Sequence, residues 1–153
     1  MQNTIQIRKA KVHDSRIIAD FNKAMALETE NTILEDKVIA SGVSNLLNHP
    51  ERGFYLIAEI EGQIAGSLMI TTEWSDWRNG LFWWIQSVYI QPEHRRKGIY
   101  RALYNYVKQL ADVEQIICGF RLYVEKNNHI AQNTYKSLGM SETHYLVYEE
   151  MTK

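Results

Sequence analysis

In the first part of the chain, a segment with apolar residues at every second position is followed by two segments whose apolar residues have helical spacing. Residues 4–9 place every second side chain on an apolar face, which predicts a half-buried strand. Helical spacing then predicts a helix that begins at Asp14 or Ser15 and runs to about residue 27. A polar stretch over 28–31 is expected to end it, and a second helical pattern covers 38–47.

The rest of the chain predicts most of a sheet. In chain order, the pattern indicates strands over 54–60, 63–72 and 81–91, a helix from residue 98 to about 113, a strand over 116–125, a helix over 128–138 and a closing β-hairpin over 141–151. Glu61-Gly62 suits a hairpin turn. The 81–91 strand is apolar on both faces, which places it inside the sheet. A strand, a helix and a strand in succession predict parallel neighbours with a right-handed crossover.

A basic turn stands between the 81–91 strand and the helix that follows it. The segment VYIQPEHRRKGIYRAL carries Arg95, Arg96, Lys97 and Arg101 within seven residues, and Gly98 marks the start of the helix. A helix N-terminus leaves its first N–H groups unpaired and carries partial positive charge, so it binds anions, and glycine lets a ligand approach the backbone. The chain has neither a P-loop nor a G-x-G-x-x-G pattern. The turn nevertheless indicates a pyrophosphate site, the alternative being a solvated basic corner.

Two motifs resemble those of the GNAT N-acetyltransferase superfamily. Residues 95–100 follow the acyl-CoA pattern [QR]-x-x-G-x-[GA], except that Tyr100 stands where glycine or alanine is usual. Later in the chain, the family pattern N-x-x-A-x-x-x-Y-x-x-x-G-[FM] is matched by Asn128, Ala131, Tyr135 and Gly139-Met140. The chain is therefore identified as a bacterial-type, single-domain member. The resemblance implies an α/β (α+β) fold: a mixed, mostly antiparallel central sheet with one parallel, splayed pair of strands and about four helices.

The resemblance also implies a cofactor site for acetyl-CoA. In the family the pantetheine arm lies between the two splayed strands, paired here with backbone groups of Val88 and Ile90, while the amides of 96–101 hold the pyrophosphate. Tyr100 makes the helix start more crowded than usual. The implied binding set is Val88, Tyr89, Ile90, Arg95, Arg96, Lys97, Gly98, Ile99, Tyr100, Arg101 and Asn128. From the residues alone, Asn128 is a helix cap, and Arg95 and Arg96 are either phosphate partners or solvated.

The chemistry requires an acid and a base. By resemblance Tyr135 is the general acid, although its helical spacing from Leu138 also suits a tyrosine of the core. An alkylamine of pKa about 10.4 is neutral at pH 7 only to about one part in 2,500, so its proton must be removed. Glu73 is the first candidate for this base and Glu28 the second. Water relayed along the central strand is a third route.

Composition narrows the class of protein. With 153 residues, 45% of them hydrophobic, the chain suits one N-acetyltransferase domain over 1–153. A net charge of −1 with local basic residues argues against nucleic-acid binding. No signal segment and no apolar run of the roughly 20 residues that span a bilayer occurs, so a soluble, cytoplasmic protein without a membrane partner is expected. The single cysteine, Cys118, excludes an internal disulfide, and no His/Cys spacing indicates a metal.

The resulting prediction is an N-acetyltransferase. It moves an acetyl group from acetyl-CoA to a primary amine of a small molecule or peptide by direct attack in a ternary complex. The alternative is a non-catalytic acyl-CoA-binding sensor, which would need neither Tyr135 nor a base. The acceptor's identity and the oligomeric state, a homodimer included, stay open.

Overall fold

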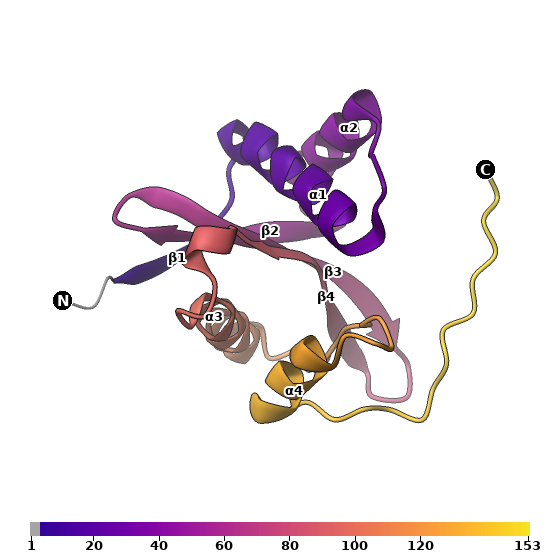
Figure 1. Ribbon diagram of the computed structural model, residues 1–153. Helices are drawn as coiled ribbons and strands as arrows, with labels where there is room; N and C mark the ends of the chain where they lie inside the picture. The colour runs from indigo at the N-terminus through magenta and orange to yellow at the C-terminus, as the bar shows by residue number, and fades with distance from the viewer. Residues whose placement is uncertain (1–3) are drawn as a thin grey trace. The chain divides into compact units, whose positions relative to one another are not determined.

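The computed structural model describes residues 4–153 and divides the chain into two compact units, one up to Leu122 and one from Tyr123 onward (Figure 1). The first unit contains β1 (Ile5–Lys9), η1 (Val12–Asp14), α1 (Ser15–Glu30), α2 (Asp36–Leu47), β2 (Gly53–Ile60), β3 (Gln63–Ser75), β4 (Gly80–Ile90), η2 (Pro92–His94), α3 (Ile99–Glu114) and β5 (Ile117–Arg121). The second unit contains α4 (His129–Ser137), followed by a segment without regular structure. Within residues 4–153, no helix combines the length and apolar character needed to cross a membrane.

The sheet has the predicted mixed topology. Its order is β1-β2-β3-β4-β5, with antiparallel pairs up to β4 and a parallel pair between β4 and β5. The turn between β2 and β3 is the expected one, because Glu61 and Gly62 both have positive φ, at 51° and 77°. The predicted interior position of β4 and the parallel pair that follows it are confirmed.

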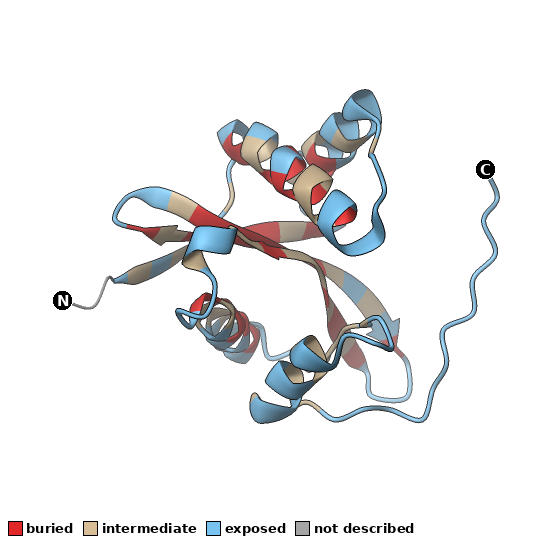
Figure 2. Cartoon of the chain, viewed as in Figure 1, coloured by how far each residue is buried: buried red, intermediate tan, exposed pale blue. Residues whose placement is uncertain are grey.

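Apolar side chains pack on both faces of the sheet, with α1 and α2 on one face and α3 on the other (Figure 1). On β2, Tyr55 and Ile57 face α1 and α2 and join a buried cluster. That cluster consists of Ile18, Ala19, Val43, Leu46, Tyr55 and Ile57. From α3, Leu103 and Val107 are completely buried. Figure 2 shows the buried residues concentrated on the inner strands and on the helix faces turned toward them. The helical period of the sequence therefore marks the buried faces of these helices.

The start and end of α1 differ from the prediction. Asp14 does not cap the helix with its side chain. Its buried carboxylate instead accepts two hydrogen bonds from Arg8, at 2.8 and 3.0 Å, and one from the Lys11 amide. The helix was expected to stop at about residue 27, but it continues through the polar residues up to Glu30. Polar residues suit the solvent-facing side of a helix, so they do not by themselves end it. The helix ends at Asn31, which adopts the left-handed conformation with φ 50°.

Two predicted strand segments are wrong. The strand expected over 116–125 ends at Arg121, where pairing with β4 stops. The closing β-hairpin expected over 141–151 does not form, and this segment is exposed and has no regular secondary structure. The segment contains no glycine, proline, asparagine or aspartate, the residues that supply tight hairpin turns. Its apolar run over 145–148 suggested a strand but could not provide the turn that a hairpin needs.

Candidate functional site

The two parallel strands separate partway along β4. Their pairing runs from Leu81, opposite Ile117, to Trp84, opposite Arg121. β4 continues to Ile90, and within residues 4–153 no strand pairs with its last part on this side. The last residues of β4 therefore leave one backbone edge vacant, as the predicted splayed pair requires.

A β-bulge determines which backbone groups face the vacant edge. The register with β3 shifts so that Ser87 and Val88 together oppose one residue, and Ser87 adopts a left-handed φ of 51°. After the bulge, the Gln91 amide donates to the carbonyl of Ala65 on β3 at 2.8 Å. Because successive residues of a strand direct their N–H and C=O groups to opposite sides, Val88 and Ile90 present theirs to the vacant edge.

The basic turn leads from this edge into α3. Arg96 and Gly98 adopt positive φ, at 63° and 81°, and Gly98 is the N-cap of the helix. A Cβ placed on Gly98 would meet no heavy atom within 4 Å, so the space beside its backbone is open. The side chains of Arg96, Lys97 and Arg101 are exposed and form no ion pair with residues 4–153. Three cations therefore surround the helix N-terminus.

Tyr100 departs from the family pattern without closing this helix N-terminus. Its ring stacks on that of Tyr104, with centroids 6.2 Å apart and an angle of 11° between the planes. The two residues are one helical turn apart, so this contact lies along α3 itself. Ile99, the preceding residue, is buried in the core. The additional bulk of the tyrosine is thus accommodated by the helix.

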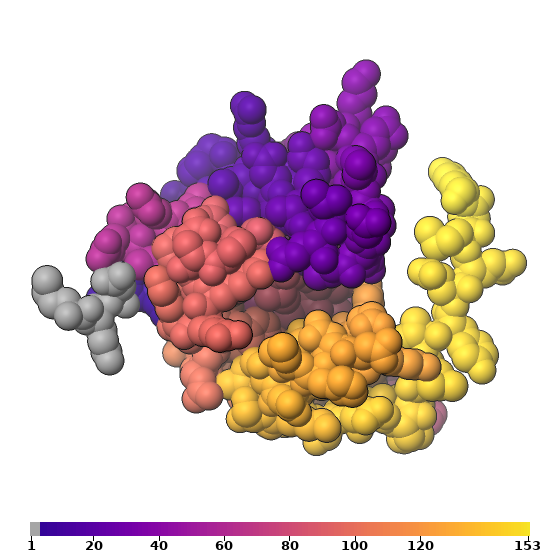
Figure 3. Space-filling view, viewed as in Figure 1, coloured from indigo at the N-terminus to yellow at the C-terminus, as the bar shows by residue number. Residues whose placement is uncertain are grey.

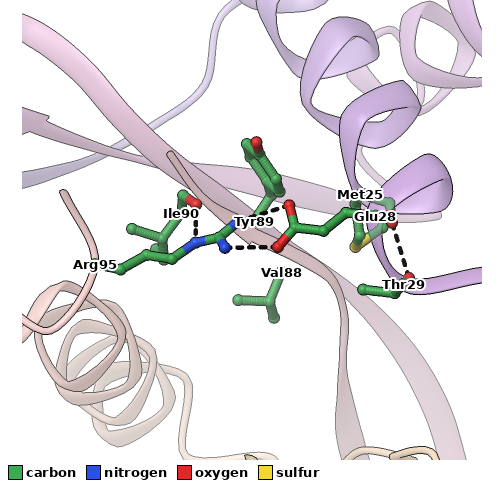
Figure 4. Close-up of a pocket in the computed structure, with 7 residues that line it drawn as sticks. All are labelled: Met25, Glu28, Thr29, Val88, Tyr89, Ile90 and Arg95. Atoms are coloured by element: carbon green, nitrogen blue, oxygen red, sulfur yellow. Dashed lines mark hydrogen bonds and ion pairs between the residues drawn. The ribbon is translucent and has the colours of Figure 1, made fainter. Parts of the chain in front are cut away.

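Arg95 is engaged differently from the other cations of the turn. Its Nη1 and Nη2 donate to the two carboxylate oxygens of Glu28 at 2.6 and 2.9 Å, and its Nε donates to the carbonyl of Ile90 at 2.9 Å (Figure 4). The pKa of Glu28 lies below its ordinary value, chiefly because of the hydrogen bond from Arg95. These groups border a cavity of about 210 Å³. Its lining residues are Met25, Glu28, Thr29, Val88, Tyr89, Ile90 and Arg95.

Glu73 belongs to a second cluster, at the point where β4 and β5 separate. Its carboxylate accepts a hydrogen bond from Trp84 Nε1 at 2.7 Å and two from Arg121 Nη1 at 3.0 Å. The guanidinium of Arg121 also lies 3.7 Å from the centroid of the Phe82 ring. The hydrogen bond from Trp84, followed by that from Arg121, holds the pKa of Glu73 below its ordinary value. The two carboxylates proposed as bases thus have different partners.

The second unit holds the two other motif residues. Asn128 is the N-cap of α4, and its side-chain oxygen accepts a hydrogen bond from the Ala131 amide at 3.1 Å. Tyr135 lies on α4 and is partly buried, and this burial raises its pKa. A phenol with a raised pKa stays protonated at neutral pH, which is the state that a general acid needs.

Three residues have roles in this region that the sequence did not indicate. Ser87 looks like an ordinary strand residue, and the left-handed conformation of a serine leaves no compositional signal. Trp84 and Arg121 become partners of Glu73 only once the strand register is known. A charged residue in an otherwise apolar strand, as in the segment GFRLYV, was the one available indication of Arg121. Within residues 4–153, no group of three or more His, Cys, Asp or Glu residues could hold a metal ion.

Comparison with solved structures agrees with this geometry. A protein described as a possible acetyltransferase from Clostridium difficile 630 is 46% identical, with a TM-score of 0.90 over 97% of this chain and 98% of that one. Two others share the fold at lower identity. A predicted acetyltransferase from Clostridium acetobutylicum, solved with acetyl-CoA, is 22% identical, with a TM-score of 0.79 over 96% of each chain. A ribosomal-protein-alanine N-acetyltransferase from Brucella melitensis biovar Abortus 2308 is 15% identical, with a TM-score of 0.78 over 98% of this chain and 100% of that one.

Family models give the same assignment. The model described as the acetyltransferase (GNAT) family matches residues 18–140, which include the splayed strands, the basic turn and α4. No curated protein matches the chain. The family match covers most of the chain, and it agrees with the mixed sheet, the parallel pair and the vacant edge of β4. The chain belongs to the GNAT acetyltransferase family.

Proposed function

We propose that this protein transfers an acetyl group from acetyl-CoA to a primary amine of a small molecule or peptide, by direct attack in a ternary complex. The observation that carries the proposal is the vacant edge of β4, which leads directly into the open, basic N-terminus of α3. An extended chain of amides suits the strand edge, and a diphosphate suits the helix N-terminus.

The residues around the edge divide the binding of acetyl-CoA between them. Backbone groups of Val88 and Ile90 would pair with the pantetheine arm, beside Tyr89. The amides from Arg96 to Arg101 would receive the diphosphate, with the free side chains of Arg96, Lys97 and Arg101 as counter-charges. On the second unit, Asn128 would contact the arm in addition to capping α4.

Transfer then requires three contributions from the protein: a base, a group that stabilises the oxyanion, and an acid. A base accepts the proton of the attacking amine, and Glu73 remains the first candidate, followed by Glu28 and by water. The lowered pKa values of both carboxylates leave them ionised at neutral pH, able to accept a proton but weak as bases. An N–H group of the β4 edge stabilises the oxyanion of the tetrahedral intermediate, and Tyr135 donates its proton to the departing thiolate.

Acetyl-CoA is expected to raise the melting temperature of the protein by about 5–10 °C. A ligand present at about 100 times its dissociation constant stabilises the native state by roughly 2.7 kcal/mol, and the shift follows for a chain of this size. The measurement is a thermal melt with and without millimolar acetyl-CoA. AMP serves as the control, because it lacks the pantetheine arm. An unchanged melting temperature would refute the proposed function.

Replacement of Glu73 by glutamine is expected to slow acetyl transfer most near neutral pH, if Glu73 accepts the amine's proton. The loss should diminish as the pH rises, because the free amine then becomes abundant without a base. The measurement is a pH profile of thiol release for the wild type and the variant. A slowing that is the same at every pH would assign Glu73 to the positioning of Trp84 and Arg121, and the base to Glu28 or water.

A non-catalytic acyl-CoA-binding sensor is the second candidate. It is favoured by one observation: both carboxylates that could act as the base already form hydrogen-bonded ion pairs with an arginine. Such a protein would show the melting shift with acetyl-CoA but release no thiol with any amine of a broad panel. Turnover therefore separates the two functions.

A further inference from the structure

The Glu28–Arg95 pair connects two parts of the first unit that lie far apart in the sequence. Glu28 is in the last turn of α1, and Arg95 is in the basic turn, 67 positions later. Figure 4 shows the Arg95 side chain reaching from the turn, across the end of β4, to α1. In the space-filling view the basic turn lies against α1 at the surface (Figure 3). This pair, with the Arg95 bond to Ile90, forms a three-point contact between the turn, the strand and the helix.

The geometry of the contact is that of a specific interaction. Each terminal guanidinium nitrogen donates to a different carboxylate oxygen, which holds the two side chains in one orientation. The Arg95 guanidinium also lies 5.5 Å from the centroid of the Tyr89 ring. By comparison, the ion pair between Lys23 and Asp36, which joins α1 to α2, has a single hydrogen bond of 2.8 Å. A lysine pair of this kind restricts orientation far less.

Arg95 is not needed as a counter-charge for the diphosphate. Arg96, Lys97 and Arg101 are exposed at the same helix N-terminus and are free to neutralise it. Arg95 instead occupies the carbonyl of Ile90, one of the two residues that face the vacant edge. A molecule that pairs with this edge therefore restrains the residue to which Arg95 is bonded.

We propose that Glu28 and Arg95 are positioning residues that transmit occupancy of the β4 edge to the end of α1. The inference rests on the proposed function, because the occupant is the pantetheine arm of a coenzyme A molecule. When the edge is filled, Ile90 and the basic turn lose freedom of motion, and the bidentate pair passes this restraint to the last turn of α1. Binding at the edge and ordering of the end of α1 are then thermodynamically coupled, so that each favours the other.

Hydrogen–deuterium exchange with coenzyme A as the probe tests this link without knowledge of the acceptor. In the wild type, saturating coenzyme A is expected to slow amide exchange at residues 26–31 by about threefold to tenfold, since exposed ion pairs couple groups by about 1 kcal/mol. Replacement of Glu28 by glutamine should abolish this difference. The variant keeps a residue of similar helix propensity, so its exchange without coenzyme A should change little.

The matched control is Lys23→Gln, which removes the ion pairs of Lys23 with Asp36 and Asp20 but leaves the Glu28–Arg95 pair in place. It should retain the full effect of coenzyme A at 26–31. A second variant, Arg95→Gln, removes the other partner of the pair and should behave as Glu28→Gln does. Amide exchange at 26–31 is measured at saturating coenzyme A in every variant, so that a difference in affinity for coenzyme A does not affect the comparison.

The outcomes separate this inference from the proposed function. If coenzyme A slows exchange along β4 but affects 26–31 equally in the wild type and in Glu28→Gln, the link is refuted while the proposed function stands. The same holds if residues 26–31 do not respond in any of the proteins. If coenzyme A changes exchange nowhere in the wild type, the proposed function itself fails.

Discussion

Replacement of Tyr135 by phenylalanine is expected to lower kcat by about 10²-fold and to leave the KM for acetyl-CoA nearly unchanged. The leaving thiolate resembles that of a cysteine, with a pKa of about 8.5, so at pH 7 its protonation favours departure by only about 2 kcal/mol. Loss of the acid is thus costly but not fatal, within the usual range for general acid catalysis. Because burial raises the pKa of Tyr135, the wild type should keep this acid protonated at least as far into the alkaline range as an unperturbed tyrosine does.

Thiol release with a panel of amines, measured beside a melting curve, decides the role of Tyr135. The matched control is Tyr55→Phe, since Tyr55 is a buried tyrosine of the core cluster on β2. It should change kcat little. If Tyr135→Phe behaves in the same way, with near wild-type kcat and a lowered melting temperature, Tyr135 is a packing residue and not the acid.

Replacement of Gly98 by valine is expected to weaken acetyl-CoA binding by about 10²-fold. The open space beside Gly98 would be filled by a branched side chain, blocking the approach of a diphosphate to the amides of the turn. Two lost hydrogen bonds to a charged group, at about 1.5 kcal/mol each, correspond to this factor. The positive φ of 81° also strains valine, so the free energy of unfolding should fall by about 1–2 kcal/mol.

Gly62 provides the control for this strain. It has nearly the same φ, 77°, an equally open surrounding, and a position in the β2–β3 turn. Gly62→Val should therefore lower stability as much as Gly98→Val does, yet leave the dissociation constant for acetyl-CoA unchanged. The measurements are isothermal titration with acetyl-CoA and denaturant unfolding. Equal losses of affinity in the two variants would show that Gly98 has only a structural role.

Local patterns were sufficient to predict most of the fold. The apolar runs of β2 and β3, the Glu61-Gly62 turn and the helical period of α3 each depend on neighbours in the sequence. The parallel pairing of β4 and β5 followed from the order of their elements, because a crossover helix must separate parallel strands. Features that a segment determines by itself were therefore accessible without a structure.

Contacts between distant segments were not accessible in this way. Glu28 and Glu73 both appeared as free carboxylates, whereas the structure pairs them with Arg95 and Arg121, which are 67 and 48 positions away. Each pairing depends on where the strands and helices bring the side chains. The end of β5 at Arg121 likewise depends on its divergence from β4, and the alternation of residues in β5 continues past that point without any sign of it.

The bulge at Ser87 acts as a phase shift in the alternation of β4. Along β4, the backbone N–H and C=O groups of every second residue point toward β3. The extra residue of the bulge reverses which residues these are, so that Val88 and Ile90 face the vacant edge. Deletion of this one residue would return the strand to a regular register and turn every later backbone group to the opposite side. A family member that lost the bulge residue would need a second, compensating insertion before Pro92. Insertions and deletions between residues 85 and 91 should therefore be tolerated only in such pairs, while the β2–β3 turn is free to vary in length.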